Sequence, residues 1–195
     1  MVFWFERRQG EIIAALHRAL APWNVSLENV TWNQAPKNAS EIQLTFGVPS
    51  MSSAFQVGLG GLIINAINPD WSCAPQLISL FQTGADTLKE TVGQEFQSQQ
   101  TTLRFHVNPG PTPFREILAK FVNTQTLGSD NAAMFGVSAY SPEFSFVIDA
   151  SAILPDGVFI NLNRTFPATL RFEEMAGTIY KDEGTILQRL GLKIQ

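Results

Sequence analysis

The stretch Glu41–Pro49, EIQLTFGVP, alternates apolar residues with small or polar ones along its length. Its apolar side chains fall on one side of an extended chain: Ile42, Leu44, Phe46 and Val48. Because successive side chains of a strand point to opposite faces, this alternation predicts a strand with one buried face. The same pattern over Thr101–Asn108 predicts a second strand, with Leu103, Phe105 and Val107 inward and Arg104 and His106 outward.

Residues 54–68, AFQVGLGGLIINAIN, fit two structures. A helix would hold Gly58, Gly60 and Gly61 in its interior, at a cost of about 1 kcal/mol each relative to alanine. A strand places Phe55 and Val57 on one face, but the apolar residues after Gly61 fall on the opposite face. The sequence therefore favours a strand with a bulge at the double glycine, and a helix is the alternative.

Amphipathic helices are expected at both ends of the chain and beside the strands. Helical spacing of apolar residues marks residues 6–20 and Ser72–Phe96, a helix after Thr112, and a short C-terminal helix over Asp182–Leu190. Residues 132–174 look all-β, and their last expected strand is Ala168–Glu174. This order has no regular βαβ alternation, so the expected fold class is α+β, a mostly antiparallel sheet with helices packed on one face.

Length and cysteine content limit the classes of protein to consider. A chain of 195 residues fits one domain, so residues 1–195 are expected to form a single α+β domain. Cys73 is the one cysteine, which excludes an internal disulfide and a CxxC motif. No apolar run reaches the roughly 18–20 residues of a membrane span, and the N-terminus does not resemble a signal peptide. A cytoplasmic location is expected.

Charge is scarce in this chain. Charged residues make up 15% of it, against roughly 25% in an average globular protein. The net charge is −4 and Arg7-Arg8 is the one basic pair, so neither nucleic acid nor a membrane surface is an expected partner. Interface cores are depleted of charge, which favours a homo-oligomer or a protein partner. The apolar segment Phe3-Trp4-Phe5 is the candidate partner-binding surface.

The tetrapeptide Thr-Leu-Arg-Phe occurs twice, at Thr102–Phe105 and Thr169–Phe172. If both lie in neighbouring strands, Arg104 and Arg171 flank His106 and form an anion-binding patch. These three residues are the candidate ligand-binding site. Glu173 lies on the same predicted face as Arg171, so ordinary cross-strand ion pairing is the competing interpretation.

No motif in the chain points to a catalytic group, a metal or a cofactor. Two histidines and one cysteine have no spacing typical of zinc ligands, and Gly58-Leu59-Gly60-Gly61 lacks the GKS/T end of a phosphate loop. The sequence favours a non-catalytic binding or assembly domain over an enzyme. The alternative is a protein that binds a small apolar or anionic ligand between sheet and helices, with or without weak catalysis.

Overall fold

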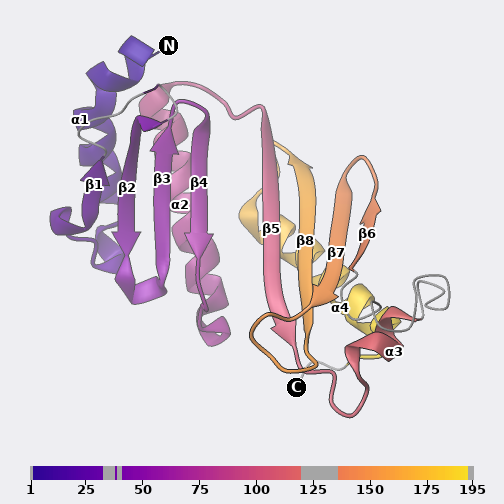
Figure 1. Ribbon diagram of the computed structural model, residues 1–195. Helices are drawn as coiled ribbons and strands as arrows, with labels where there is room; N and C mark the ends of the chain where they lie inside the picture. Colours follow the sequence, from indigo (N-terminus) through magenta and orange to yellow (C-terminus); the bar gives the residue numbers. More distant parts are fainter. Residues whose placement is uncertain (1, 33–37, 39–40, 120–135, 193–195) are drawn as a thin grey trace. The chain divides into compact units, whose positions relative to one another are not determined.

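An antiparallel meander of four strands forms the sheet of the first half of the chain, as Figure 1 shows for the computed structural model. The structure describes residues 2–32, 38, 41–119 and 136–192. The strand order is β1-β2-β3-β4, with bounds Val30–Trp32, Gln43–Val48, Ser53–Gly58 and Gly61–Ala66. Two helices, α1 Val2–Ala19 and α2 Ala74–Val92, pack on one face of this first sheet. Neither helix covers the opposite face.

The alternation in β2 builds the core between this sheet and its helices. Leu44, Phe46 and Val48 are fully buried, whereas the side chains between them belong to the uncovered face. Phe55 of β3 pairs with Phe46 and is also fully buried. Its ring meets Phe81 of α2 edge to face, with 6.3 Å between the ring centroids. The helices are held to the sheet by this apolar layer.

Residues 54–68 are extended, so the strand expectation is confirmed, but the bulge is wrong. The chain turns back at Leu59-Gly60, and β3 and β4 form a tight hairpin in which Gly58 pairs with Gly61. Val57 then lies opposite Leu62, and Phe55 lies opposite Ile64, on the same face. The apolar residues shift from odd to even positions at the glycines because the chain reverses direction there, and both sets lie on one face of the sheet. Gly61 adopts φ 138, a conformation that favours glycine.

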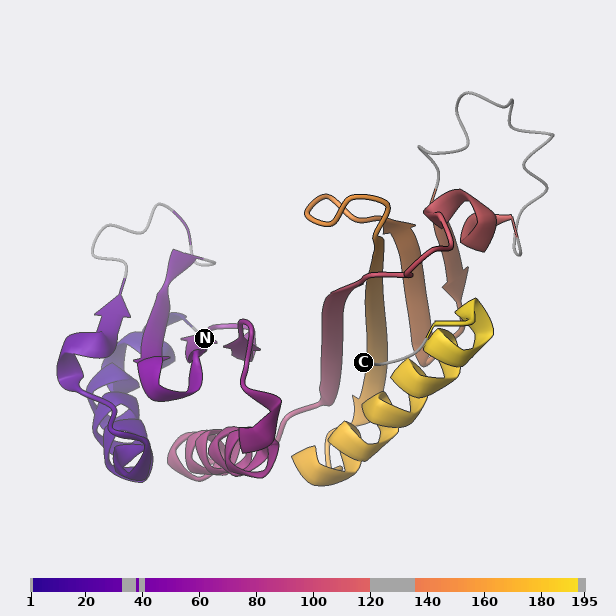
Figure 2. The ribbon, with the colours of Figure 1, turned by 90° about the horizontal axis from the view of Figure 1, so that it is seen from below.

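A second antiparallel sheet of four strands lies in the second half of the chain. Its order is β5-β8-β7-β6, with bounds Ser98–Val107 for β5, Val137–Tyr140 for β6, Phe144–Ala150 for β7 and Val158–Pro167 for β8. The short helix α3 Phe114–Leu118 and the long helix α4 Phe172–Leu190 contribute to the core on one face (Figure 2). Ile160 and Leu162 of the central strand β8 are fully buried there.

The expected strand Ala168–Glu174 is wrong. Residues 168–170 form a turn, and α4 begins at Phe172 with Arg171 as its N-cap. The carboxylate of Glu174 accepts a hydrogen bond of 3.1 Å from the Arg171 backbone N–H, and Glu173 and Glu174 are the acidic first turn that favours a helix start. Local capping therefore outweighs an alternating pattern that spans only a few residues.

The α+β class, with antiparallel strands and helices at both ends, is confirmed. The strands form two sheets instead of one, and the chain divides into two compact units, Met1–Phe96 and Gln97–Gln195. That residues 1–195 behave as a single domain stays a prediction. β1 is short, because Leu27–Asn29 forms a 3-10 turn ahead of it.

Candidate functional site

β5 holds Arg104 and His106 on the face of the second sheet that its helices leave uncovered. Leu103, Phe105 and Val107 contact the core on the other face, as the alternation predicted. Arg104 pairs with Asn161 of β8. His106 pairs with Phe159, and their ring centroids lie 5.0 Å apart. The sequence therefore identified two residues that do share one face of a sheet.

Arg171 does not join them. The contact between β5 and the turn before α4 is made by Gln99, whose Nε2 donates hydrogen bonds to the carbonyls of Ala168 at 2.9 Å and Leu170 at 2.8 Å. Seven residues of extended chain, roughly 20 Å, separate Gln99 from His106. Arg171 lies at the far end of β5 from His106, because the segment that carries it is a helix start and not a neighbouring strand.

His106 has a partner that sequence reasoning missed. Its Nδ1 lies 2.8 Å from Oγ of Ser151, in the loop between β7 and β8. The same oxygen accepts hydrogen bonds from the backbone N–H groups of Ile153 at 3.2 Å and Leu154 at 2.8 Å. With both lone pairs occupied, the hydroxyl is left as the donor to Nδ1, an arrangement that requires the ring hydrogen on Nε2. Nucleophilic attack needs a free lone pair, so this pair anchors a loop and is not an activated serine.

Asn161 lies in the middle of the uncovered face. It faces Arg104 on β5 and Val147 on β7. Its Oδ1 is buried and has no hydrogen-bond partner among the described residues. In the next row Thr102 donates a hydrogen bond of 2.6 Å to Asn163. A buried acceptor without a donor is costly, so Asn161 marks a place where a hydrogen-bond donor would bind favourably.

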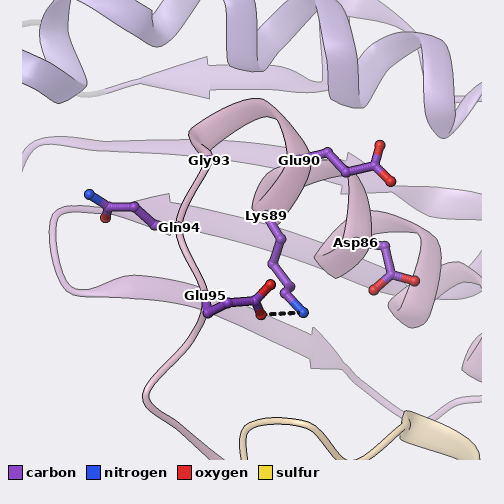
Figure 3. A pocket seen from close by; sticks show the side chains of 6 residues that line it. All are labelled: Asp86, Lys89, Glu90, Gly93, Gln94 and Glu95. Carbon is purple, nitrogen blue, oxygen red and sulfur yellow. Dashed lines mark ion pairs between the residues drawn. The ribbon is translucent and has the colours of Figure 1, made fainter.

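A pocket of about 320 Å³ lies at the C-terminal end of α2, in the first unit (Figure 3). It is lined by Asp86, Lys89, Glu90, Gly93, Gln94 and Glu95. The ammonium of Lys89 lies 2.6 Å from the carboxylate of Glu95, and this hydrogen bond raises the pKa of Lys89. Gln94 points away from the other side chains. The pocket is thus lined by charged residues, one amide and a glycine, with Lys89–Glu95 as an ion pair, and it lacks the apolar and aromatic side chains typical of ligand sites.

Cys73 sits at the start of α2, beside Asp70. Its Sγ lies 4.0 Å from a carboxylate oxygen of Asp70. Hydrogen bonds from Ser72 lower the pKa of Asp70, so this carboxyl is ionised near neutral pH. Within the described ranges no group of three or more acidic, histidine or cysteine residues could hold a metal ion, and no helix is long and apolar enough to cross a membrane.

The four edge strands of the two sheets differ in their protection against pairing with another strand. β1 and β6 have only three and four residues, and β5 carries Arg104 and His106. β4 has six residues, GLIINA, in a region without any charged residue from Ile42 to Pro69. Proteins block their edges with short strands, charges, prolines and bulges. Of the edge strands that the structure describes, β4 is the least protected.

Two isoleucines along this free edge are exposed. Ile63 in β4 is 58% exposed and Ile67, just after the strand, is 72% exposed. Leu62, Ile64 and Ala66 belong to the helix-covered face and are partly buried against the core. We use the term β4 edge for residues 61–67. The backbone of Phe3-Trp4-Phe5 belongs to α1, and the side chains of these three residues lie outside the described part of the chain.

Comparisons of the chain with models of protein families, with curated proteins and with solved structures found no match. The functional inference therefore rests on the chain's own residues, above all those of the β4 edge.

Proposed function

We propose that this chain is a non-catalytic subunit that acts by association, with itself or with a protein partner. The observation that carries the proposal is the β4 edge, a row of backbone donors and acceptors next to exposed isoleucines and without a protecting charge. Unpaired edges bind added strands through main-chain hydrogen bonds. The low charge of the whole chain supports the same conclusion, because association then requires little desolvation of ions. A cytoplasmic location remains part of the proposal.

Light scattering on the purified protein over a range of concentrations tests this function. We expect the mass per particle to rise with concentration, or a partner to co-purify in a fixed ratio. A monomer at every concentration, together with no partner after gentle purification, would contradict the proposal.

A second candidate function is the binding of a small anion at the uncovered face of the second sheet. The specific observation is the buried, unpaired Oδ1 of Asn161, in the residue that pairs across the strands with the exposed Arg104. A small hydroxy acid would offer a carboxylate to Arg104 and, once the side chains that cover Oδ1 of Asn161 move aside, a hydroxyl hydrogen to that oxygen. This site lies on the side away from α4, not between sheet and helix as the sequence suggested, and it does not include Arg171.

Titration with lactate, followed by NMR, tests this second function. We expect the amide signals of Arg104, His106 and Asn161 to shift at millimolar lactate, and the shifts to disappear in Arg104→Gln. Arg189→Gln, which removes an exposed arginine from the last turn of α4, is the matched control and keeps the shifts. Unchanged spectra, or equal shifts all over the protein, would eliminate the site.

A further inference from the structure

We infer that the partner of the β4 edge is a second copy of this chain, paired antiparallel with the first about a two-fold axis at Ile64. This inference rests on the proposed function and names its partner. The two first sheets would join edge to edge into one continuous sheet, with Leu62 opposite Ala66 of the other copy and Ile64 opposite its own equivalent.

The backbone register decides which groups are free for this pairing. The N–H of Ile67 donates a hydrogen bond of 3.0 Å to the carbonyl of Ser52, which continues the β3–β4 ladder. In an antiparallel ladder, bonded and non-bonded pairs alternate along the strand. Ile63 and Asn65 therefore bond to β3, whereas the N–H and C=O groups of Leu62, Ile64 and Ala66 point to the free side. Pairing centred on Ile64 uses all of these free groups, in about six hydrogen bonds.

The side chains of the β4 edge suit pairing with a copy of themselves. A two-fold axis perpendicular to the sheet keeps each face on its own side, so Leu62, Ile64 and Ala66 of the two copies meet in one apolar layer. On the other face Ile63 lies opposite Asn65 of the second copy and diagonal to its own equivalent, about 7–8 Å away. The exposed Ile63, at 58%, would lose part of its contact with water.

Charge favours a second copy over another partner. In a symmetric pair a charged side chain close to the axis lies near its own equivalent, so like charges there oppose association. From Ile42 to Pro69 the chain has no charged residue, and this penalty is absent at the β4 edge. A partner of opposite charge, in contrast, would gain nothing from this edge. β5 has a longer edge, but self-pairing there would bring Arg104 near a second Arg104.

The size of the contact sets its strength. One six-residue strand pairing with its copy buries less than the roughly 1,200 Å² at the lower end of stable interfaces. α2 lies under the β3–β4 side of the sheet, and α1 lies on the β1–β2 side (Figures 1 and 2), so α2 can add side-chain contacts across the axis. We therefore expect a dimer whose population depends on concentration.

Sedimentation and light scattering of the full chain and three variants test the inference. Ile63→Lys adds a charge to the β4 edge on the face away from the core. Ala66→Pro removes the backbone N–H that points to the free side, and it leaves the hydrogen bonds between β3 and β4 intact. We expect both to weaken dimerisation at least about tenfold, because each blocks the edge in the way natural proteins do. Ile153→Lys makes the same change at a residue that is 69% exposed, in the loop before β8, and should dimerise like the original chain. Far-UV circular dichroism checks that each variant is folded.

Three outcomes are possible for the self-pairing of the β4 edge. A dimer that both edge variants weaken and Ile153→Lys preserves supports the inference. A dimer that persists in a folded Ile63→Lys variant overturns the inference but leaves the proposed function standing, because another surface must then associate. A monomer at all concentrations overturns the inference, and the proposed function then survives only if a different protein co-purifies in a fixed ratio.

Discussion

Replacing Gly84 with alanine destabilises the protein by about 3 kcal/mol, although alanine is the better helix former by about 1 kcal/mol. Gly84 is buried in α2 where the helix crosses Phe55 of β3. An added Cβ would overlap Cε1 of the Phe55 ring and lie 2.8 Å from its Cζ. Phe55 is fully buried, so its ring cannot swing into solvent to make room. Glycine at this position allows the helix to approach the first sheet closely.

Urea unfolding followed by tryptophan fluorescence measures this effect. All the tryptophans lie in the first unit, at Trp4, Trp23, Trp32 and Trp71. The matched control is Gly10→Ala in α1 of the same unit, where an added Cβ meets nothing within 4 Å. This control should stabilise its helix by up to about 1 kcal/mol. If Gly84→Ala proved neutral or stabilising, α2 could not pack against Phe55 as described.

Replacing Asp182 with alanine should lower the stability of the second unit by about 2 kcal/mol. Nε of Arg164 on β8 lies 2.6 Å from one carboxylate oxygen of Asp182 on α4, and the second nitrogen lies 3.1 Å from the other. The two side chains are only 22% and 16% exposed. Removing the carboxylate leaves the guanidinium partly buried beside the rings of Phe144 and Phe166, without its charged partner. The cost comes mainly from this unpaired charge.

Far-UV circular dichroism during urea unfolding follows this change, since the second unit contains no tryptophan. Glu11→Ala is a suitable comparison, because it removes the partner of Arg8 in a pair in which Glu11 is 61% exposed. Exposed pairs contribute between about 0 and 1 kcal/mol, so this variant should remain close to the original stability. Equal effects of Asp182→Ala and Glu11→Ala would show that the Arg164–Asp182 pair does not hold α4 to its sheet.

Local periodicity was sufficient to predict the strands that alternate over six or more residues. β2 and β5 lie where their patterns indicated, because one buried face imposes a period of two that few other structures share. Ala168–Glu174 alternates as well, but the acidic residues at Glu173 and Glu174, a cation at Arg189 and a glycine at Gly191 together indicate one helix. Those end signals were present in the sequence and carried more information than the short alternation.

The strand order could not be predicted in the same way. The second sheet, with β5 at its edge, depends on the pairing of β5 with β8, which are distant in sequence, whereas the first sheet is a meander of consecutive strands. The face shared by Arg104 and His106 followed from alternation alone. The contact of His106 with Ser151, 45 residues later, had no local signal. The sequence shows that the stretch around β4 has no charged residue. That one edge of β4 is unpaired follows only from the order of strands in the sheet.

Amide hydrogen exchange of residues 61–67, measured in dilute and in concentrated protein, tests the pairing of β4 with a second copy most directly. We expect the amides of Leu62, Ile64 and Ala66 to exchange quickly in dilute protein and to become protected as the concentration rises, while the amides of β5 do not change. Exchange of these three amides at the same rate at every concentration would contradict this pairing.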